Sequence, residues 1–327
     1  MTRALLPFIA AVLVLGSSCR IGYTSGKEML EADWFDPINT LTVWVLADIQ
    51  PKKKSHRDAW EEAVRDMNEN VPGIDFAIVA GDIVNDTEEE TFDWYVNTRN
   101  GSYVEEWYEI IGNHDLKTDR GKLFREKLRK ETDYAILKGN ILFIFMSDSE
   151  RGKSTVISDE TFEWWKDLVV NNQDKIIVVV THAPLKGSGI SFSAWKGRNI
   201  VGSRRFREVL KDYRVDLWFS GHLHIPHGVL STTAKKESLG GTVFIHVSSI
   251  RPEVGGMKES ESRVMTFVCG SDKVLVRVRN HERRQYVTNL DEVFTLSKPY
   301  ECKDVKPVAG PLTPGKITGA ESSASAP

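Results

Sequence analysis

The chain has 327 residues, of which 41% are hydrophobic and 27% charged, and its formal net charge at pH 7 is -3. This composition is typical of a globular protein with a sizeable core, and it excludes disordered, fibrous and collagen-like chains. The charge lacks the basic excess that holds nucleic acid phosphates nonspecifically, so specific or polymeric nucleic acid binding is not expected.

The N-terminus has the layout of a signal peptide. Arg3 precedes an apolar run over residues 4–15, and small residues then lead to Cys19. The run is too short to span a bilayer comfortably, and no later segment has about 18 uninterrupted apolar residues. The sequence therefore predicts export, with residues 1–18 as the signal peptide.

The position of Cys19 leaves two forms of the exported protein open. A cysteine after small residues resembles a bacterial lipoprotein box, in which that cysteine is lipidated, although Gly16 stands where such boxes usually carry Leu. Ordinary cleavage between Ser18 and Cys19 also fits. The expected location is a bacterial periplasm or envelope, or alternatively the outside of the cell, with membrane attachment only through a lipid on Cys19.

A single domain is predicted over residues 40–302. Residues 19–39 form a lead-in, and residues 303–327 are so rich in Pro, Gly, Ser and Ala that they predict a disordered tail. Cys269 and Cys302 could pair in an oxidising compartment, which sequence alone does not establish.

Short apolar runs with strand character alternate with helical patterns along the domain. The expected strands are residues 41–47, 76–80, 141–146, 176–180, 217–220 and 243–247. Helices are expected after a capping box of Ser55 and Asp58, after Ser158, and from about Ser203. A late hairpin is expected around Gly270. The alternation predicts a layered α/β protein.

Polar clusters follow the apolar runs directly, where open α/β sheets bind ligands at the carboxyl ends of their strands. In chain order they are Asp48 with Gln50, Asp82, Asn113 with His114 and Asp115, His182, and His222 with His224. Such groups at the ends of buried strands are costly unless compensated, and a metal ion is the strongest compensation. Oxygen and imidazole donors without thiolate favour Mn, Fe, Zn or Co over Cu(I).

The ordered set D-x-Q, G-D, G-N-H-D, H and G-H-x-H resembles the calcineurin-like metallophosphoesterase superfamily over nearly the whole domain. Each element alone is a weak signal, whereas all five in order are specific. The resemblance implies a four-layer α/β/β/α sandwich, in which two packed mixed β-sheets are flanked by helices. It also implies an enzyme that hydrolyses phosphate esters or anhydrides with two divalent metal ions.

The resemblance further implies a role for each residue. Asp82 would bridge the two ions, which activate a shared water. The other implied ligands form two sets of three, one for each ion: Asp48, Gln50 and His224, and Asn113, His182 and His222. His114 would stand free of the metals and face the substrate, stabilising charge or protonating the leaving group, with Asp115 orienting or polarising its ring.

Gln50 departs from the family pattern, which usually has His at this place. An amide oxygen is a weaker ligand, so Gln50 could loosen one metal, shift the preference towards Mn or Mg, or let water take the position. D-x-Q also resembles a branch that cleaves nucleoside diphosphate compounds such as ADP-ribose. The tyrosine that follows G-D in purple acid phosphatases is missing. A small phosphodiester or pyrophosphate is therefore favoured over a phosphomonoester as substrate.

Other residues have two interpretations each. The Lys52–Lys54 run either attracts anionic substrate or is a solvated loop, and residues 187–193 suggest a mobile lid beside His182. Trp195 either stacks on a base or packs locally. Five basic residues are candidates for binding the far end of the substrate: Lys186, Lys196, Arg198, Arg204 and Arg205. For Arg204 and Arg205 the alternative is the exposed face of the helix that buries Phe206. Four histidines outside the motifs are expected to be surface or core residues: His56, His227, His246 and His281.

The alternative function is a non-catalytic metal- or phosphate-binding surface protein of the same fold, which lost activity through changes such as Gln50. The intact motifs argue against it, and His114 most of all. On this interpretation His114 performs chemistry rather than holding metal, so a decayed site would be expected to lose it.

Overall fold

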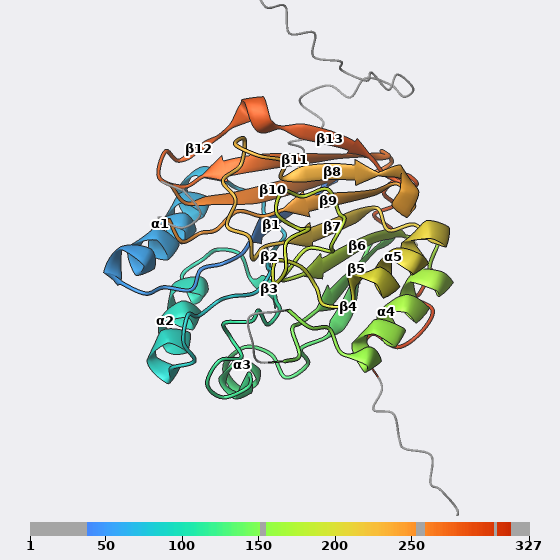
Figure 1. Cartoon of the computed structure of the whole chain (residues 1–327). Helices are drawn as coiled ribbons and strands as arrows, with labels where there is room; N and C mark the ends of the chain where they lie inside the picture. Colours follow the sequence, from blue (N-terminus) through green and yellow to red (C-terminus); the bar gives the residue numbers. More distant parts are fainter. Residues whose placement is uncertain (1–37, 151–154, 253–258, 304–305, 315–327) are drawn as a thin grey trace, which may run out of the picture.

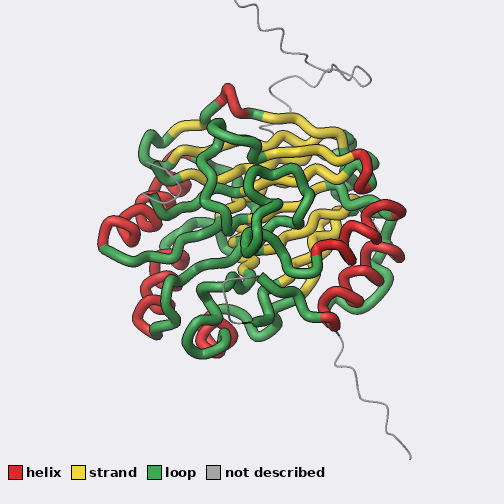
Figure 2. The backbone as a smooth tube through the Cα atoms, in the orientation of Figure 1, coloured by secondary structure: helices red, strands yellow, loops and turns green. Residues whose placement is uncertain are grey.

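The computed structural model describes residues 38–150, 155–252, 259–303 and 306–314. The predicted signal peptide and Cys19 lie outside these residues. Two β-sheets pack face to face, and helices cover their outer sides (Figures 1 and 2). The predicted four-layer sandwich is therefore confirmed. None of the described helices has the length and apolar character needed to cross a membrane.

The first sheet is mixed. It has seven strands: β1 (Thr40–Leu46), β2 (Phe76–Val79), β3 (Glu106–Glu109), β10 (Glu261–Val268), β11 (Lys273–Asn280), β12 (Gln285–Tyr286) and β13 (Glu292–Thr295). Strands β1, β2 and β3 are parallel, while β10 pairs antiparallel with β1 and with β11. The β10–β11 pair is the predicted late hairpin. Three helices belong to this half: α1 (Lys54–Asn70), α2 (Glu89–Asn100) and α3 (Lys122–Lys127).

The second sheet is also mixed. Its order is β4 (Tyr134–Lys138), β5 (Ile141–Met146), β6 (Ile176–Thr181), β7 (Leu217–Ser220), β9 (Thr242–His246) and β8 (Thr233–Lys236). The four central strands are parallel, and the edge strands β4 and β8 are antiparallel to their neighbours. Helices α4 (Asp159–Asn171) and α5 (Ser203–Asp212) cover its outer face, and two short 3-10 helices are Glu237–Leu239 and Thr288–Leu290.

Strands β2, β5, β6, β7 and β9 are buried on both faces because both faces of these strands are covered. In β1, Val43 and Val45 enter the core between the sheets, whereas Trp44 and Leu46 pack on the outer side with Trp60 of α1. The six predicted strands are all found, with each end within one residue of its expected position. Buried apolar runs of this kind are a strong local signal, which explains the agreement.

Two of the three predicted helix starts agree with the structure and one differs. Helix α5 begins at Ser203, as predicted. Ser158 is the N-cap of α4, and its hydroxyl accepts a hydrogen bond from the Thr161 backbone N–H at 3.0 Å. The prediction of a capping box at Ser55 and Asp58 is wrong, because α1 begins at Lys54 and its N-cap residue makes no side-chain capping hydrogen bond. Asp58 instead pairs with Lys54 at 2.5 Å, one turn earlier on the helix surface.

The C-terminal segment packs on the second sheet. Ala309 exchanges two backbone hydrogen bonds with the Asn172 side chain, at 2.8 and 2.9 Å, and the Leu312 carbonyl accepts from the Ala135 N–H at 2.7 Å. The expectation of disorder from residue 303 is therefore wrong for residues 309–312. Its partners lie far away in the sequence, so composition alone does not reveal them. Residues 315–327 of the expected tail lie outside the described part of the chain.

Candidate metal centre

The predicted site residues lie where the carboxyl-terminal ends of parallel strands from the two sheets meet. Asp48 and Asp82 follow β1 and β2 of the first sheet, and His182 and His222 follow β6 and β7 of the second. The His222 backbone N–H donates to Asp48 Oδ2 at 2.8 Å, which joins the loops of the two sheets. Strand topology thus gathers side chains that are far apart in the sequence.

The motif glycines allow the ligand loops to approach closely. A Cβ on Gly112 would lie 2.4 Å from the Asp82 backbone nitrogen and Oδ1, and a Cβ on Gly221 would lie 2.6 Å from Asp48 Oδ2. Asp48, Asp82, His222 and His224 all have positive φ, at 55°, 55°, 68° and 51°. Non-glycine residues rarely adopt this conformation, and such strain concentrates at functional sites.

Two groups of candidate metal-binding atoms share Asp82. Asp48, Asp82 and His224 form one group and Asp82, His182 and His222 the other, with the atoms of each group within 4.8 Å of one another. His224 Nε2 lies 3.0 Å from Asp48 Oδ1, and His182 Nε2 lies 3.3 Å from Asp82 Oδ2. These donors fit two divalent cations that share one carboxylate, as the sequence predicts.

Asn113 has the free atom that a metal ligand needs. It lies one residue after Gly112, and its Oδ1 is buried without a hydrogen-bond partner among the described residues. Buried polar oxygens are normally paired, so an unpaired one marks a place for a missing ligand or ion. Asn113 therefore also fits its predicted role.

The electrostatics keep the carboxylates ionised. Burial by itself raises the pKa of Asp82, but the neighbouring His182 outweighs it, and the net result is a pKa below the ordinary value. The pKa of Asp48 is also below its ordinary value, because the nearby His224 outweighs the effect of burial. Burial, aided by His182, lowers the pKa of His222 to about 4, so its imidazole is neutral at pH 7. Ionised carboxylates and neutral imidazole are the forms that bind cations.

Gln50 faces this centre with its amide nitrogen instead of its oxygen. Nε2 lies 3.1 Å from Asp82 Oδ2 and 3.0 Å from His224 Nε2, while Oε1 accepts a hydrogen bond from Arg251 at 3.1 Å. The expected oxygen ligand is thus turned away in this structure. Sequence reasoning missed Arg251, because a single arginine far outside the motifs gives no signal.

His114 stands at the edge of the centre, and its ring is held by a backbone carbonyl. His114 Nδ1 is 3.2 Å from the Asn85 carbonyl oxygen, and its Nε2 is 4.0 Å from Asp82 Oδ2. The side chain is 23% exposed, whereas the predicted ligands are buried. This position suits a group that meets substrate rather than one that holds metal.

Asp115 does not orient His114, which corrects that prediction. Its carboxylate is fully buried and accepts from the backbone N–H groups of Val84, at 2.9 Å, and Gly112, at 2.8 Å. It therefore ties the G-N-H-D loop to the G-D loop. The role expected of Asp115 belongs to the Asn85 carbonyl, which no side-chain motif could reveal.

Asp148 is a second buried acid near the centre that the sequence does not single out. It follows β5, next to the strand that leads to His182, and neither of its oxygens has a hydrogen-bond partner among the described residues. Burial raises its pKa well above the ordinary value. The raised pKa favours the protonated form of this carboxyl group, although the nearby His182 opposes the shift.

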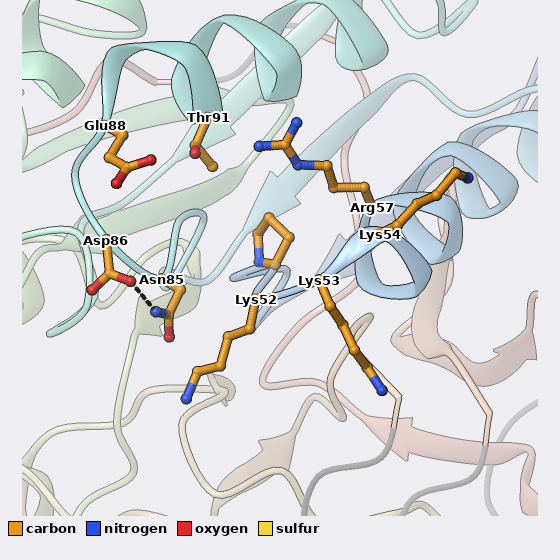
Figure 3. A pocket seen from close by; sticks show the side chains of 9 residues that line it. Lys52, Lys53, Lys54, Arg57, Asn85, Asp86, Glu88 and Thr91 are labelled. Carbon is orange, nitrogen blue, oxygen red and sulfur yellow. Dashed lines mark hydrogen bonds between the residues drawn. The ribbon is translucent and has the colours of Figure 1, made fainter.

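A pocket of about 700 Å³ includes the predicted lysine run and is lined in part by Asn85, the neighbour of His114 (Figure 3). Its lining has four basic and two acidic side chains among nine residues: Pro51, Lys52, Lys53, Lys54, Arg57, Asn85, Asp86, Glu88 and Thr91. Figure 3 shows Asp86 and Glu88 on the side opposite Arg57. Asn85 connects the pocket to His114 through its carbonyl.

The two arginines at the start of α5 differ in their surroundings. Arg204 forms an exposed pair with Glu208 at 3.8 Å, which supports the surface interpretation for Arg204. Arg205 is half-buried, pairs with Asp159 and donates to the Ile157 carbonyl at 2.7 Å. Trp195 is 62% exposed and packs against Phe192, with ring centroids 4.6 Å apart. The loop that carries Trp195 reaches the centre through the Gly197 carbonyl, 3.2 Å from His222 Nε2.

The four histidines outside the motifs are core residues. All four are buried: His56, His227, His246 and His281. His281, for example, lies 2.9 Å from Asp66 and 2.8 Å from the Ser262 hydroxyl. The core alternative in their interpretation is therefore confirmed.

Comparisons with known proteins agree with this geometry. The sequence model of the calcineurin-like phosphoesterases matches residues 41–226, which is more than half of the chain. The structure is similar to a dimetal phosphatase from Danio rerio, with a TM-score of 0.61 and 11% identity over 79% of this chain and 100% of that one. A comparison with curated proteins found no match.

Two further solved structures share the fold. The yellow lupin purple acid phosphatase has a TM-score of 0.55 and 14% identity, over 83% of this chain and 57% of that one. GAP50, the anchor in the inner membrane complex of Plasmodium, has a TM-score of 0.53 and 14% identity, over 80% of this chain and 90% of that one. At these identities the likeness concerns the fold alone.

Proposed function

The chain belongs to the calcineurin-like phosphoesterase family, and on that premise we propose that it hydrolyses a small phosphodiester or pyrophosphate with two bound divalent cations. The observation that carries the proposal is the pair of ligand groups that share Asp82, with His114 beside them. Cations bound there would supply Lewis acidity and an activated water. Which of Mn, Fe, Zn and Co they are is a matter for metal analysis.

His114 is the proposed proton donor to the leaving group. Because the Asn85 carbonyl oxygen only accepts hydrogen bonds, Nδ1 of His114 carries a proton, and Nε2 exchanges the second one. Burial lowers the pKa of His114, although the nearby Asp82 opposes the shift. Protonated His114 is thus a stronger acid than an ordinary histidine, which favours proton transfer to a leaving oxygen.

The pocket lined in part by Asn85 is the proposed place for the rest of the substrate. Lys52, Lys53 and Arg57 line it, and these cations would attract a second anionic group such as a neighbouring phosphate. A phosphomonoester has no such second group. The basic side chains of the pocket therefore support a pyrophosphate, which carries a second anionic phosphate, over a simple monoester.

Export is proposed on two observations. The N-terminal sequence has the layout of a signal peptide, and Cys269 and Cys302 form a disulfide in the structure. Disulfides persist mainly in oxidising compartments such as a periplasm or the cell exterior. Whether Cys19 carries a lipid would be decided by mass spectrometry of the N-terminal peptide.

The function is tested by the choice of substrate. Purified protein would be stripped of metal, reconstituted with Mn²⁺ and assayed with p-nitrophenyl phosphate, bis-p-nitrophenyl phosphate and ADP-ribose. We expect faster turnover of the diester or ADP-ribose than of the monoester. His114→Ala should lower the rate by about 10² to 10⁴ while bound Mn²⁺ stays unchanged.

Two results would contradict the proposal in different ways. A clear preference for the monoester would make the protein a phosphatase. Absence of turnover with all three substrates, in a folded protein that binds two ions, would instead favour the non-catalytic binding protein.

The pocket has a separate test. Lys52→Ala with Arg57→Ala should raise the KM for ADP-ribose about tenfold, since each variant removes a charge that would meet an anionic oxygen. The KM for p-nitrophenyl phosphate should change much less. Lys211→Ala, an exposed lysine of α5 paired with Glu208, is the control for loss of surface charge. An equal rise in KM for both substrates would show that the pocket does not bind the second anionic group of the substrate.

A further inference from the structure

We infer that Arg251 holds the Gln50 amide in an orientation that opposes cation binding, so that the group of Asp48, Asp82 and His224 is the weaker of the two metal sites. This inference rests on the proposed dinuclear function. It concerns how the two sites differ, which the family fold does not fix. The contacts of Gln50 and Arg251 carry it.

The orientation of the Gln50 amide follows from donor chemistry. A guanidinium group has only N–H donors, so the Gln50 atom that faces Arg251 must be the oxygen. The Arg251 Nη1 donates to Gln50 Oε1 at 3.1 Å and also to the Gln50 backbone oxygen at 2.9 Å. Turning the amide over would place N–H donors against N–H donors. Arg251 therefore selects one of the two amide orientations.

The amide nitrogen then lies where it competes with a cation. Gln50 Nε2 is 3.1 Å from Asp82 Oδ2, 3.0 Å from His224 Nε2 and 3.4 Å from Asp48 Oδ1. These are the side chains of one complete ligand group. An amide N–H donor meets the same acceptors that a metal ion would use. A cation at this place must displace the amide and break its hydrogen bond with Arg251.

Arg251 also brings a positive charge close to this group. It is buried, with 5% of its surface exposed, and its Nε has no hydrogen-bond partner among the described residues. The charges that act on it are those of Asp48 and Asp82. A buried guanidinium near the same carboxylates repels an incoming cation, since charges are poorly screened in a protein interior.

The Gln50 amide meets the other group only at the shared Asp82 carboxylate, because among the described residues it makes no hydrogen bond to His182 or His222. His182 Nδ1 is 2.9 Å from the Ala80 carbonyl, which fixes the ring and leaves Nε2 directed at Asp82. Asn113 adds a buried oxygen with no partner among the described residues. A carbonyl behind a ligating histidine is the usual arrangement that strengthens a metal site. The structure therefore favours cation binding at the group of Asp82, His182 and His222 over binding at the group of Asp48, Asp82 and His224.

The test is Mn²⁺ binding, measured by calorimetry and by counting bound ions, on the full protein after metal removal. We expect two binding steps, with affinities that differ at least about tenfold in the wild type. Arg251→Met should strengthen the weaker step about tenfold and leave the tighter step unchanged. Gln50→Ala should not weaken either step, whereas loss of a true oxygen ligand would.

Two further variants serve as a control for surface charge and as an independent test of the Gln50 amide. Lys211→Met removes an exposed positive charge of α5 without contact to the Gln50 side chain, and it should leave both steps unchanged. Gln50→Glu keeps an oxygen for Arg251 and offers a second oxygen to the cation, so it should strengthen the weaker step even if Arg251→Met folds poorly.

Equal affinities in the wild type, or a weaker second step in Gln50→Ala, would overturn the inference and restore Gln50 as a ligand. Binding of fewer than two ions by every variant would contradict the dinuclear centre itself. Because the readout is metal binding, inactivity towards the chosen substrates has no bearing on it.

Discussion

At the scale of single residues, the site depends on close contacts that only small or strained residues allow. Asp48, Asp82, His222 and His224 all hold positive φ, and the glycines of the motifs stand where a Cβ would collide with a ligand. The motifs therefore meet two requirements: the Asp and His residues supply the metal-binding atoms, and the glycines leave space for them.

Gly112→Ala tests the second requirement. The added Cβ would lie 2.4 Å from Asp82, so the loop must shift and move the shared carboxylate. We expect Mn²⁺ affinity to fall at least about tenfold, in a protein destabilised by about 1 to 3 kcal/mol. Gly270→Ala, where the Cβ meets open space at a positive φ far from the site, is the control. Unchanged Mn²⁺ binding in Gly112→Ala would contradict the requirement for space.

At the scale of elements, a buried charge network joins helix α1 to the first sheet. Asp66 of α1 pairs with Arg279 of β11, and its second oxygen is 2.9 Å from His281 Nδ1. All three side chains are buried. Because a charge left alone in the interior is costly, the network stabilises the protein only while it is complete.

Asp66→Asn should lower the free energy of unfolding by about 3 kcal/mol, because it leaves Arg279 buried without its counterion. Urea denaturation at pH 7 measures the loss. Asp58→Asn on the exposed surface of the same helix removes a pair that solvent screens, and it should cost less than about 1 kcal/mol. Equal losses in the two variants would show that burial is unimportant here.

The same network predicts how stability depends on pH. Burial raises the pKa of Asp66, but the hydrogen bonds from Arg279 and His281 outweigh it and lower the pKa to about 2, from an ordinary value of 3.8. A carboxyl whose pKa is lowered by folding stabilises the protein above its unfolded pKa, and this contribution disappears as the pH falls. The advantage over Asp66→Asn should therefore shrink by about 2 kcal/mol between pH 4 and pH 2. An advantage that stays constant over this interval would contradict the shift.

At the scale of the whole molecule, the end of the domain fastens the two sheets together. Cys269 follows β10 of the first sheet, and its disulfide partner Cys302 follows Glu301, which exchanges backbone and side-chain hydrogen bonds with Asn140 between β4 and β5 of the second. The metal centre needs both sheets, so a link between them also supports the site.

Replacing both cysteines by alanine should lower the free energy of unfolding by about 3 kcal/mol, as expected for a disulfide that closes a loop of 33 residues. The measurement is urea denaturation of the oxidised wild type and the double variant. Addition of reductant should destabilise the wild type by a similar amount and leave the variant unchanged. A variant as stable as the wild type would show that the sheet contacts alone hold this end.

The sequence by itself determined six central strands, the β10–β11 hairpin and the side chains of the centre, and the family resemblance implied the sandwich. Buried strands are continuous apolar runs, and metal ligands at their ends must be polar. Both can therefore be recognised from short stretches of sequence. Asp48, Asp82, His182, His222 and His224 could all be chosen this way, and the structure brings them into two adjoining groups.

Only the tertiary structure decided how these side chains are oriented. Arg251 turns the Gln50 amide, the Asn85 carbonyl holds His114, and Asp115 binds backbone N–H groups instead of the His114 ring. The C-terminal segment likewise gains its hydrogen bonds from Asn172 and Ala135. In each case the partner is distant in the sequence or is a backbone atom. A hydrogen bond depends on direction and distance in space, and residue types along the chain do not encode either.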